Sequence, residues 1–132
     1  MKIIVNGTFD ILHRGHIELL EYAKSLGEFL LVCIDTDRRV AELKGQGRPI
    51  NNQDDRQFML NGLKAVDAVW TFDSEEALEN ICQMYQPDIM VKGSDYRNKP
   101  IVGAEFCDEI NFFERLYEYS TTKTIQDIID RG

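Results

Sequence analysis

The stretch Lys2–His16, KIIVNGTFDILHRGH, decides how the rest of the chain is interpreted. It opens with a short apolar run, continues through the turn 6–10 and reaches two histidines, His13 and His16. Beyond them apolar residues recur at spacings of three as far as Leu26, which predicts a helix. The stretch therefore predicts a strand, a glycine-containing turn and a helix N-terminus, where backbone N–H groups and the helix dipole suit a phosphate.

The two histidines are three residues apart at the predicted helix start, so they lie on one face and can reach the same ligand. An imidazole donates a hydrogen bond to a phosphate oxygen, and a protonated one also stabilises negative charge that develops during bond breaking. Gly15 lies between them and leaves room near the backbone, because it has no Cβ. Two ordinary histidines at a helix start are the simpler interpretation of a bare H-x-x-H, but the full pattern G-T-F-D-x-x-H-x-G-H is more restrictive.

That full pattern resembles the HxGH signature of the nucleotidyltransferase superfamily, which includes glycerol-3-phosphate cytidylyltransferase, phosphopantetheine adenylyltransferase and the adenylyltransferase domain of bacterial ADP-heptose synthesis. The resemblance covers essentially the whole chain and implies a Rossmann-like fold. It implies that His13 and His16 hold a triphosphate and stabilise charge on the α-phosphate and the leaving group. It also implies that Gly7, Thr8 and Phe9 line the nucleotide site, with Asp10 orienting the turn or helping with a metal.

The chain has 132 residues, enough for one domain with a core and too few for two, so we expect a single domain over residues 1–132. It contains no apolar run of the roughly 20 residues that a membrane helix needs, and its opening apolar run is too short for a signal peptide. Cys33, Cys82 and Cys107 lie far apart, which favours reduced thiols in the cytoplasm. The formal charge of −8 predicts poor general binding of nucleic acid, so any phosphate site needs a local cluster of bases.

Apolar periodicity and turn residues divide the rest of the chain into alternating elements. Strands are predicted at 3–5, 29–34, 68–72, 88–91 and 112–119, and helices at 16–26, 38–44, after Asn51 or Asn52, at 74–85, at 103–110 and after Ser120. The run 29–34 is continuously apolar, as in a strand covered on both faces. This order predicts an α/β fold of the Rossmann-like kind, with a mostly parallel five-stranded sheet, helices on both faces and the fifth strand at an edge.

The loop after the 38–44 helix carries two glycines, Pro49 and two cations, Lys44 and Arg48. It follows a parallel strand at its carboxyl end, where open α/β sheets bind ligands. A mobile surface loop and a loop that closes over a triphosphate explain it equally well on these residues alone. L-K-G-x-x-R-P is similar to the segment of heptose-phosphate adenylyltransferases, and the resemblance implies that Lys44 neutralises phosphate.

The next helix is expected to use Phe58, Met59, Leu60, Leu63 and Val66 as its apolar face. Arg56 lies near its start, where a surface ion pair would be the ordinary role. R-x-x-x-L resembles a helix of the superfamily in which an arginine faces the active site.

The predicted strand 88–91 runs into a second loop, Lys92–Tyr96. Gly93 permits close approach of a ligand, Asp95 could accept from a sugar hydroxyl, and Lys92 could offset phosphate charge or be a surface lysine. K-G-x-D-Y resembles the heptose-phosphate branch.

Near the C-terminus, Ser120 is a candidate N-cap for the last helix. Such a cap is ordinarily structural, but Ser120, Thr121 and Thr122 match the closing S-T-T motif of the superfamily, which grips the triphosphate. The preceding segment 115–119 lacks the R-T-E-G-I of glycerol-phosphate enzymes, which weakens a cytidylyltransferase assignment.

The resemblance implies attack of a sugar or polyol phosphate on the α-phosphate of a nucleoside triphosphate, with Mg²⁺ bound mainly through the triphosphate and no protein metal site. ATP is favoured, giving an ADP-sugar such as ADP-heptose; CTP with glycerol 3-phosphate, giving CDP-glycerol, is the alternative. A non-catalytic nucleotide-binding module is the rival from another class, because fold alone does not establish activity. By analogy with the superfamily we expect a homodimer. The cysteines, the net charge and the lack of a long apolar run predict a cytoplasmic protein with no nucleic-acid or membrane partner.

Overall fold

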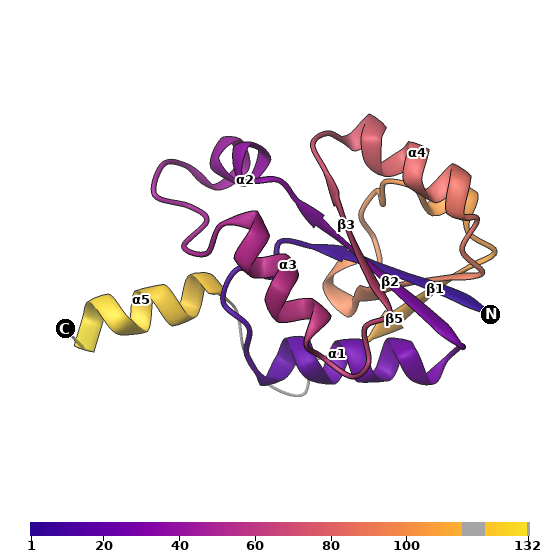
Figure 1. Cartoon of the computed structure of the whole chain (residues 1–132), viewed down its shortest axis with the longest axis horizontal. Helices are drawn as coiled ribbons and strands as arrows, with labels where there is room; N and C mark the ends of the chain where they lie inside the picture. Colours follow the sequence, from indigo (N-terminus) through magenta and orange to yellow (C-terminus); the bar gives the residue numbers. More distant parts are fainter. Residues whose placement is uncertain (115–120, 132) are drawn as a thin grey trace.

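The computed structural model describes residues 1–114 and 121–131 of the chain (Figure 1). Its helices and strands are β1 (Lys2–Gly7), α1 (Arg14–Ser25), β2 (Phe29–Asp35), α2 (Asp37–Lys44), α3 (Gln53–Asn61), β3 (Ala68–Phe72), α4 (Glu75–Tyr85), β4 (Ile89–Gly93), β5 (Glu109–Phe113) and α5 (Thr121–Arg131). Two 3-10 turns, η1 (Ser94–Tyr96) and η2 (Ala104–Phe106), lie between β4 and β5.

The five strands form one sheet in the order β3-β2-β1-β4-β5, and every pairing in it is parallel. The chain adds strands on one side of β1 as far as β3 and then crosses to the other side for β4 and β5. β1 is thus the strand at which the order reverses, and ligands bind at such points in open α/β sheets. The prediction of a Rossmann-like α/β fold with a parallel five-stranded sheet is confirmed, as is the position of β5 at an edge.

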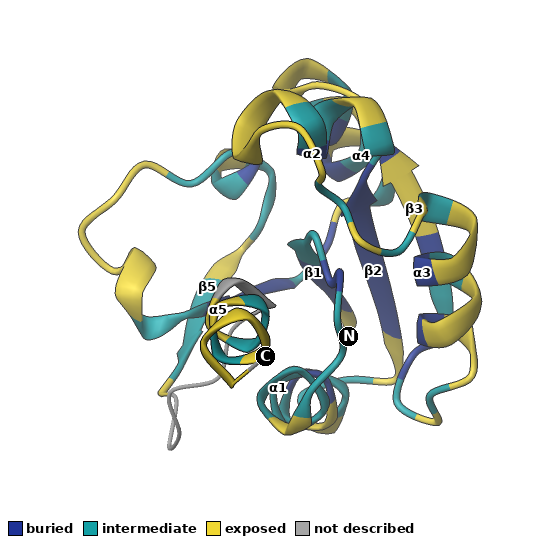
Figure 2. Cartoon of the chain, turned by 90° about the vertical axis from the view of Figure 1, so that its left-hand side faces the viewer, coloured by how far each residue is buried: buried dark blue, intermediate teal, exposed yellow. Residues whose placement is uncertain are grey.

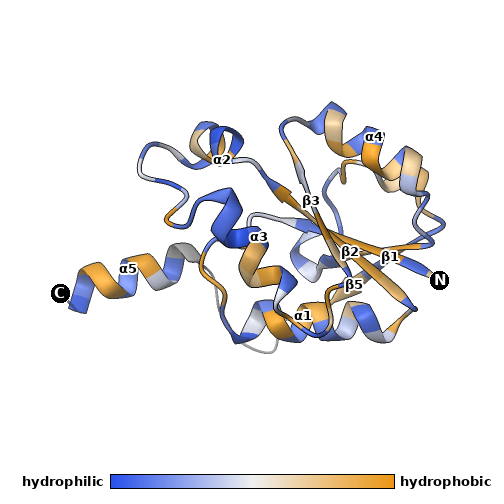
Figure 3. Ribbon diagram, in the orientation of Figure 1, coloured by the Kyte–Doolittle hydropathy of each residue, from blue (hydrophilic) through white to orange (hydrophobic). Residues whose placement is uncertain are grey.

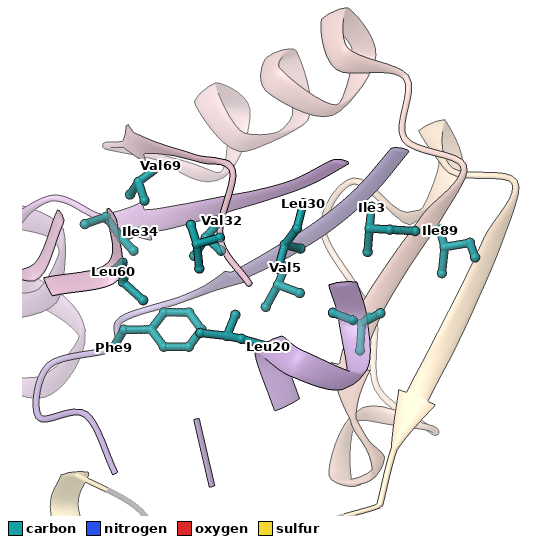
Figure 4. Close-up of a cluster of buried hydrophobic side chains, with 13 residues drawn as sticks. Ile3, Val5, Phe9, Leu20, Leu30, Val32, Ile34, Leu60, Val69 and Ile89 are labelled. Atoms are coloured by element: carbon teal, nitrogen blue, oxygen red, sulfur yellow. The ribbon is translucent and has the colours of Figure 1, made fainter. Parts of the chain in front are cut away.

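Each face of the sheet packs into its own hydrophobic cluster. Val32 and Ile34 of β2 point to the side covered by α1 and α3, where they meet Leu20 and Leu60 (Figure 4). Cys33, between them, points to the side covered by α4. Both faces of β2 are therefore buried, which explains its continuous apolar run and its dark-blue colour in Figure 2.

Two polar side chains cap helices as their sequence positions suggest. Asn52 accepts a hydrogen bond from the backbone N–H of Asp55 at the start of α3, 2.8 Å away. Ser74 accepts from the N–H of Ala77 at the start of α4, 3.0 Å away. Each satisfies an N–H that has no partner inside its helix. Asn51, the other candidate for α3, has a different role, described below.

The predicted apolar face of the third helix is wrong in part. Phe58 is 78% exposed and Met59 is 53% exposed, while the buried residues of α3 are Arg56 and Leu60. Residues 56 and 60 are four apart and share the inward face, so the helix turns Phe58 and Met59 outward. α3 ends at Asn61, so residues 63 and 66 pack from the following loop.

The predicted boundaries around the last strand also need correction. A helix was expected over 103–110, but only η2 is helical there, and Glu109 already belongs to β5. The strand predicted at 112–119 begins earlier, because β5 runs from Glu109 to Phe113. Residues 115–119 of that prediction lie outside the described residues. Pairing with β4 aligns Ile89 with Glu109. This contact between distant segments, which local periodicity does not encode, sets the strand start.

The described C-terminal helix, α5, extends away from the sheet, and the chain ends on the opposite side of the molecule from its N-terminus (Figure 1). Ile128 and Ile129 of α5 are both more than 60% exposed. No helix within residues 1–114 or 121–131 has the length and apolar character needed to cross a membrane.

Candidate functional site

The sheet opens between β1, its central strand, and the neighbouring strand β4. β1 pairs with β4 only at Ile3–Ile89 and Ile4–Met90, whereas its pairing with β2 continues to Gly7. The carboxyl-terminal halves of β1 and β4 therefore run on without pairing to each other. Because this opening lies where the strand order reverses, it is the place in the sheet best suited to a ligand.

A cavity of about 430 Å³ occupies this opening. Its volume is in the range of small-molecule sites. Among the predicted site residues it is lined by Gly7, Thr8, Phe9, His13, His16, Lys44, Lys92 and Gly93. The structure therefore brings together residues from the first strand, the first helix, the end of the second helix and the fourth strand.

The turn after β1 has an unusual backbone that shapes the cavity wall. Phe9 has a φ of +51° and is 5% exposed. A Cβ on Gly7 would lie 2.9 Å from Cε2 of Phe9. A side chain at position 7 would therefore clash with the Phe9 ring, which folds back over Gly7.

Asp10 lies behind the turn and does not line the cavity. Its carboxylate, which is almost completely buried, accepts hydrogen bonds from the backbone N–H groups of Ile50 and Asn51, both at 2.8 Å. The side chain of Asn51 returns a hydrogen bond to the backbone carbonyl of Asp10, and Arg48 Nε lies 3.5 Å from its carboxylate. Asp10 thus ties the histidine-bearing turn to the loop before α3.

Arg56 is also buried behind the cavity, with only 1% of its surface exposed. Its guanidinium donates to the carbonyls of Thr8 (2.9 Å) and Asn51 (3.0 Å) and to the carboxylate of Asp37 (2.8 Å). Arg56 therefore reaches the site only through the backbone that it supports. A buried guanidinium with a hydrogen-bond partner on each nitrogen positions the turn at Thr8.

The two histidines are stacked. His13 is the N-cap of α1 and His16 lies in its first turn, and their ring centroids are 3.8 Å apart with an 18° angle between the planes. Nδ1 of His16 accepts from the backbone N–H of His13 at 3.3 Å, which assigns the proton of a neutral His16 ring to Nε2. Two protonated rings at this distance would repel each other, so an anion beside both would stabilise them.

Lys92 is the last but one residue of β4, not a loop residue as predicted, and it is 9% exposed. Its Nζ lies 3.3 Å from Oδ1 of Asn6 and 4.3 Å from the centre of the Tyr96 ring. Burial lowers the pKa of Lys92, and the negative charges of Asp35 and Asp95 only partly oppose this. The Lys92 side chain thus crosses the opening between β4 and β1.

Lys44 is exposed at the end of α2 and borders the cavity. The loop beyond it contains Gly45 and Gly47, both with positive φ, and a Cβ on either would meet no atom within 4 Å. The predicted loop is therefore confirmed, and its surroundings are open.

Of the remaining predicted site residues, two lie away from the cavity and three belong to the closing S-T-T motif. Gly15 lies in the first turn of α1 and Asp95 is exposed, and neither borders the cavity. Thr121 and Thr122 begin α5, the predicted last helix. Ser120 lies outside the described residues, so the role of the S-T-T motif stays a prediction.

Sequence reasoning missed a charged pair in the cavity wall, Asp35 and Arg39. Asp35 ends β2, and its carboxylate receives Arg39 Nε at 2.9 Å. Thr8 Oγ1 donates to the same carboxylate at 3.3 Å. The signal was available: an acid at the end of an apolar strand, four residues before an arginine on the next helix.

No group of three or more His, Cys, Asp or Glu side chains in the described ranges is arranged to hold a metal ion. The nearest carboxylates, Asp10 and Asp35, are already engaged by backbone N–H groups, Thr8 and Arg39.

Comparisons with known proteins agree with this geometry. The sequence model of a family described as cytidylyltransferase-like matches residues 4–127. The chain is 44% identical over 126 residues to the bifunctional protein HldE of Sulfurimonas denitrificans and 46% identical to that of Campylobacter fetus. Each match covers 96% of this chain, but the chain spans only 26–27% of the length of these relatives.

Solved structures show the same fold. A lipopolysaccharide core biosynthesis protein from Thermoplasma volcanium superposes with a TM-score of 0.67 at 25% identity, covering 91% of this chain and 98% of that one. Pantothenate synthetase from Thermus thermophilus superposes with a TM-score of 0.63 at 14% identity, covering 96% and 64%. At that identity the second likeness concerns the fold alone.

Proposed function

The chain belongs to the cytidylyltransferase-like family, and from this premise we propose that it transfers the adenylyl group of ATP to a sugar phosphate. The enzyme class predicted from the sequence, nucleotidyltransferase, is confirmed by the family and by the HldE relatives. The preference for ATP and a heptose phosphate is supported by the L-K-G-x-x-R-P and K-G-x-D-Y segments and by the identity to HldE. The product would be an ADP-sugar such as ADP-heptose.

The observation that carries the proposal is the cluster of donors around the opening between β1 and β4. His13 and His16 lie at the N-terminus of α1, Lys92 reaches across the opening from β4, and Lys44 borders it from α2. All four can donate hydrogen bonds or positive charge to phosphate oxygens. In a chain with a net charge of −8, a local set of donors that includes Lys44 and Lys92 supports a site for a polyphosphate.

In the proposed reaction an oxygen of the sugar phosphate attacks the α-phosphorus of ATP. The bond between that phosphorus and the oxygen bridging to the β-phosphate breaks, and pyrophosphate leaves with the electron pair. The nucleophile is already an anion, so no general base is needed, and catalysis consists of positioning and charge stabilisation. His16 donates from Nε2 to the oxygen that gains charge, and the backbone at Thr8 and Phe9 holds the nucleotide.

Mg²⁺, bound through the triphosphate, would supply further neutralisation of the phosphate charge. The chain's own contribution to that charge is Lys44, carried on the glycine loop, and Lys92. Arg56 and Asp10 act at a distance, because they position the turn and the loop that carry the contacting groups.

We also propose that residues 1–132 act as one domain of a cytoplasmic homodimer. Apolar residues colour parts of α3 and α5 orange in Figure 3, and among them Phe58, Met59, Ile128 and Ile129 are exposed. These exposed residues support contact with a second copy of the chain. Analytical ultracentrifugation would show a two-chain species, and a monomer at micromolar concentration would contradict this.

A pyrophosphate-release assay tests the function. ATP and CTP are each paired with heptose 1-phosphate, other sugar 1-phosphates and glycerol 3-phosphate. We expect turnover with ATP and a sugar 1-phosphate. Turnover only with CTP and glycerol 3-phosphate would replace the proposal with the alternative, and nucleotide binding without turnover for every acceptor would favour the non-catalytic module.

A further inference from the structure

The cavity extends past the phosphate-binding groups to the end of β2. There Asp35 is 7% exposed, and it lines the wall together with Arg39, Leu43 and Phe72. The guanidinium of Arg39 lies over the Phe72 ring, 5.7 Å from its centre. This end of the cavity is thus a charged pair set among apolar and aromatic side chains.

The charged pair differs from the phosphate-binding groups because it is neutral as a whole. Asp35 and Arg39 are joined at 2.9 Å, and their side chains are only 10% and 18% exposed. A neutral pair attracts an anion weakly. It still offers both kinds of hydrogen-bonding group, since the carboxylate has lone pairs beyond those used by Arg39 and Thr8, and the ion pair engages only Nε of the guanidinium.

Stability alone is a weak reason for a charged pair at this position. A buried ion pair costs desolvation energy that its own attraction only roughly offsets. The two hydrogen bonds that Asp35 accepts, from Thr8 and from Arg39, instead hold both charged groups in one orientation at the cavity wall. Preorganised groups of this kind bind hydroxyl ligands without further loss of side-chain freedom.

We propose that Asp35 and Arg39 bind the hydroxyl groups of the sugar phosphate and select a polyhydroxylated acceptor; this rests on the proposed function. The carboxylate accepts from one or two ring hydroxyls, while the guanidinium donates to another. Leu43 and Phe72 contact the carbon faces of the ring. The acceptor's phosphate then points along β1 toward His16, and the nucleotide occupies the Lys92 end.

The test compares Asp35→Asn with the wild type in steady-state kinetics with ATP and heptose 1-phosphate. We expect the KM for the sugar phosphate to rise about 10- to 100-fold while the KM for ATP changes less than about threefold, because only one substrate loses a charge-assisted hydrogen bond. Asp108→Asn, an exposed aspartate outside the cavity, is the matched control and should leave both constants unchanged.

Deoxy analogues of the acceptor give a second readout that does not depend on a variant. With the wild type, removal of the hydroxyl that Asp35 binds should raise the acceptor KM by a similar factor. In Asp35→Asn the same removal should cost about threefold or less, because the interaction is already lost. If Asp35→Asn does not fold, Arg39→Gln carries the same expectation, and the wild-type series with deoxy acceptors still decides.

The outcomes separate this inference from the proposed function. Wild-type turnover with a sugar phosphate, together with an Asp35→Asn enzyme whose acceptor KM is unchanged, would overturn the inference alone. A rise confined to the KM for ATP would place the nucleotide at this end and overturn it as well. No turnover of the wild type with any acceptor would overturn the proposed function first.

Discussion

The two ends of the cavity each bury positive charge, but they do so in different ways. At the β2 end, Arg39 is paired with the carboxylate of Asp35. At the β4 end, the ammonium group of Lys92 contacts the neutral side chain of Asn6 and the face of the Tyr96 ring. Asp35 balances the charge of Arg39 at one end, whereas no carboxylate of residues 1–114 or 121–131 lies within salt-bridge distance of Lys92 at the other.

This difference indicates where an anion belongs. A phosphate beside Lys92 would replace the solvation that burial removes from the ammonium group, whereas a phosphate beside Asp35 would meet a carboxylate. Burial lowers the pKa of Lys92, and the negative charges of Asp35 and Asp95 oppose this only in part. The cavity is therefore polarised, and the histidine pair lies in the turn and helix between its two ends.

The largest expected effect concerns that histidine pair. His16→Ala removes the Nε2 donor to the oxygen that gains negative charge as the phosphorus–oxygen bond breaks, so kcat should fall by about 10²–10³. Both KM values should change little, because neither end of the cavity is altered. Stopped assays at saturating ATP and acceptor measure this, with thermal melting to check the fold. Wild-type kcat in a folded variant would remove His16 from the mechanism.

Removing one partner of the Asp35–Arg39 ion pair should destabilise the protein. Arg39→Met leaves the Asp35 carboxylate at the cavity wall with only Thr8, and we expect a loss of about 2 kcal/mol in the free energy of unfolding. Urea titration at pH 7 measures it. The double variant Asp35→Asn, Arg39→Met should recover at least half of that loss, since no charge is then left unpaired. Equal destabilisation in the single and double variants would show that packing on Phe72 dominates.

Removing the positive charge of Lys92 at the other end should have the opposite effect on the free energy of unfolding. Lys92→Met keeps the volume of the side chain and removes a desolvated ammonium group, so stability at pH 7 should stay equal or rise by up to about 1 kcal/mol. The KM for ATP should nevertheless increase about tenfold, because a cation for the phosphates is lost. A variant that is both less stable and fully active would contradict the polarised cavity.

The pH dependence of the free energy of unfolding, compared between the wild type and Lys92→Met, tests the same point further. The pKa of Lys92 is lower in the folded state, so the unfolded chain binds its proton first as the pH falls from above about 10, and the wild type loses stability in that window. Lys92→Met has no such group. The advantage of the variant should therefore be present at pH 8, shrink as the pH rises towards about 10 and be absent above it in parallel urea titrations.

The histidine end of the site was predictable because its determinants are local. The strand, turn and helix start of residues 2–16 follow one another in the sequence, and the i, i+3 spacing alone places both rings together. The helix face at Phe58 and the start of β5 were wrong because each depends on contacts between distant segments. Arg56 takes the inward position on α3 to reach Thr8, and pairing with β4 sets where β5 begins.

The opening of the sheet was beyond sequence reasoning for the same reason. Val5–Gly7 and Val91–Gly93 read as ordinary strand ends, and nothing in either segment says that they will separate after Ile4 and Met90. Asp35 and Arg39 were within reach of the i, i+4 rule. Their importance depends on the cavity, which appears only when strands from both halves of the chain are assembled.

The smallest expected effect on stability concerns Asp67, which lies at the opposite end of β2 from Asp35. Asp67 lies beside the start of this strand, away from the cavity, and accepts from the N–H of Leu30 at 2.7 Å and from Lys24 Nζ at 2.6 Å. Burial acts to raise the pKa of Asp67, but these two hydrogen bonds outweigh it and the pKa lies below its usual value.

A carboxylate with a lowered folded-state pKa contributes stability that is present above its unfolded pKa of about 4 and is lost as the pH falls through the folded value. Asp67→Asn should therefore be slightly less stable than the wild type at pH 7, and the two proteins should converge below about pH 4 in urea titrations. Its KM for the sugar phosphate should equal that of the wild type, unlike Asp35→Asn at the other end of the strand. If Asp67→Asn raised the KM for the acceptor, a change at the far end of β2 would be enough to weaken acceptor binding. A raised KM in Asp35→Asn would then not show that Asp35 contacts the acceptor, and the contrast between the two ends of the cavity would be contradicted.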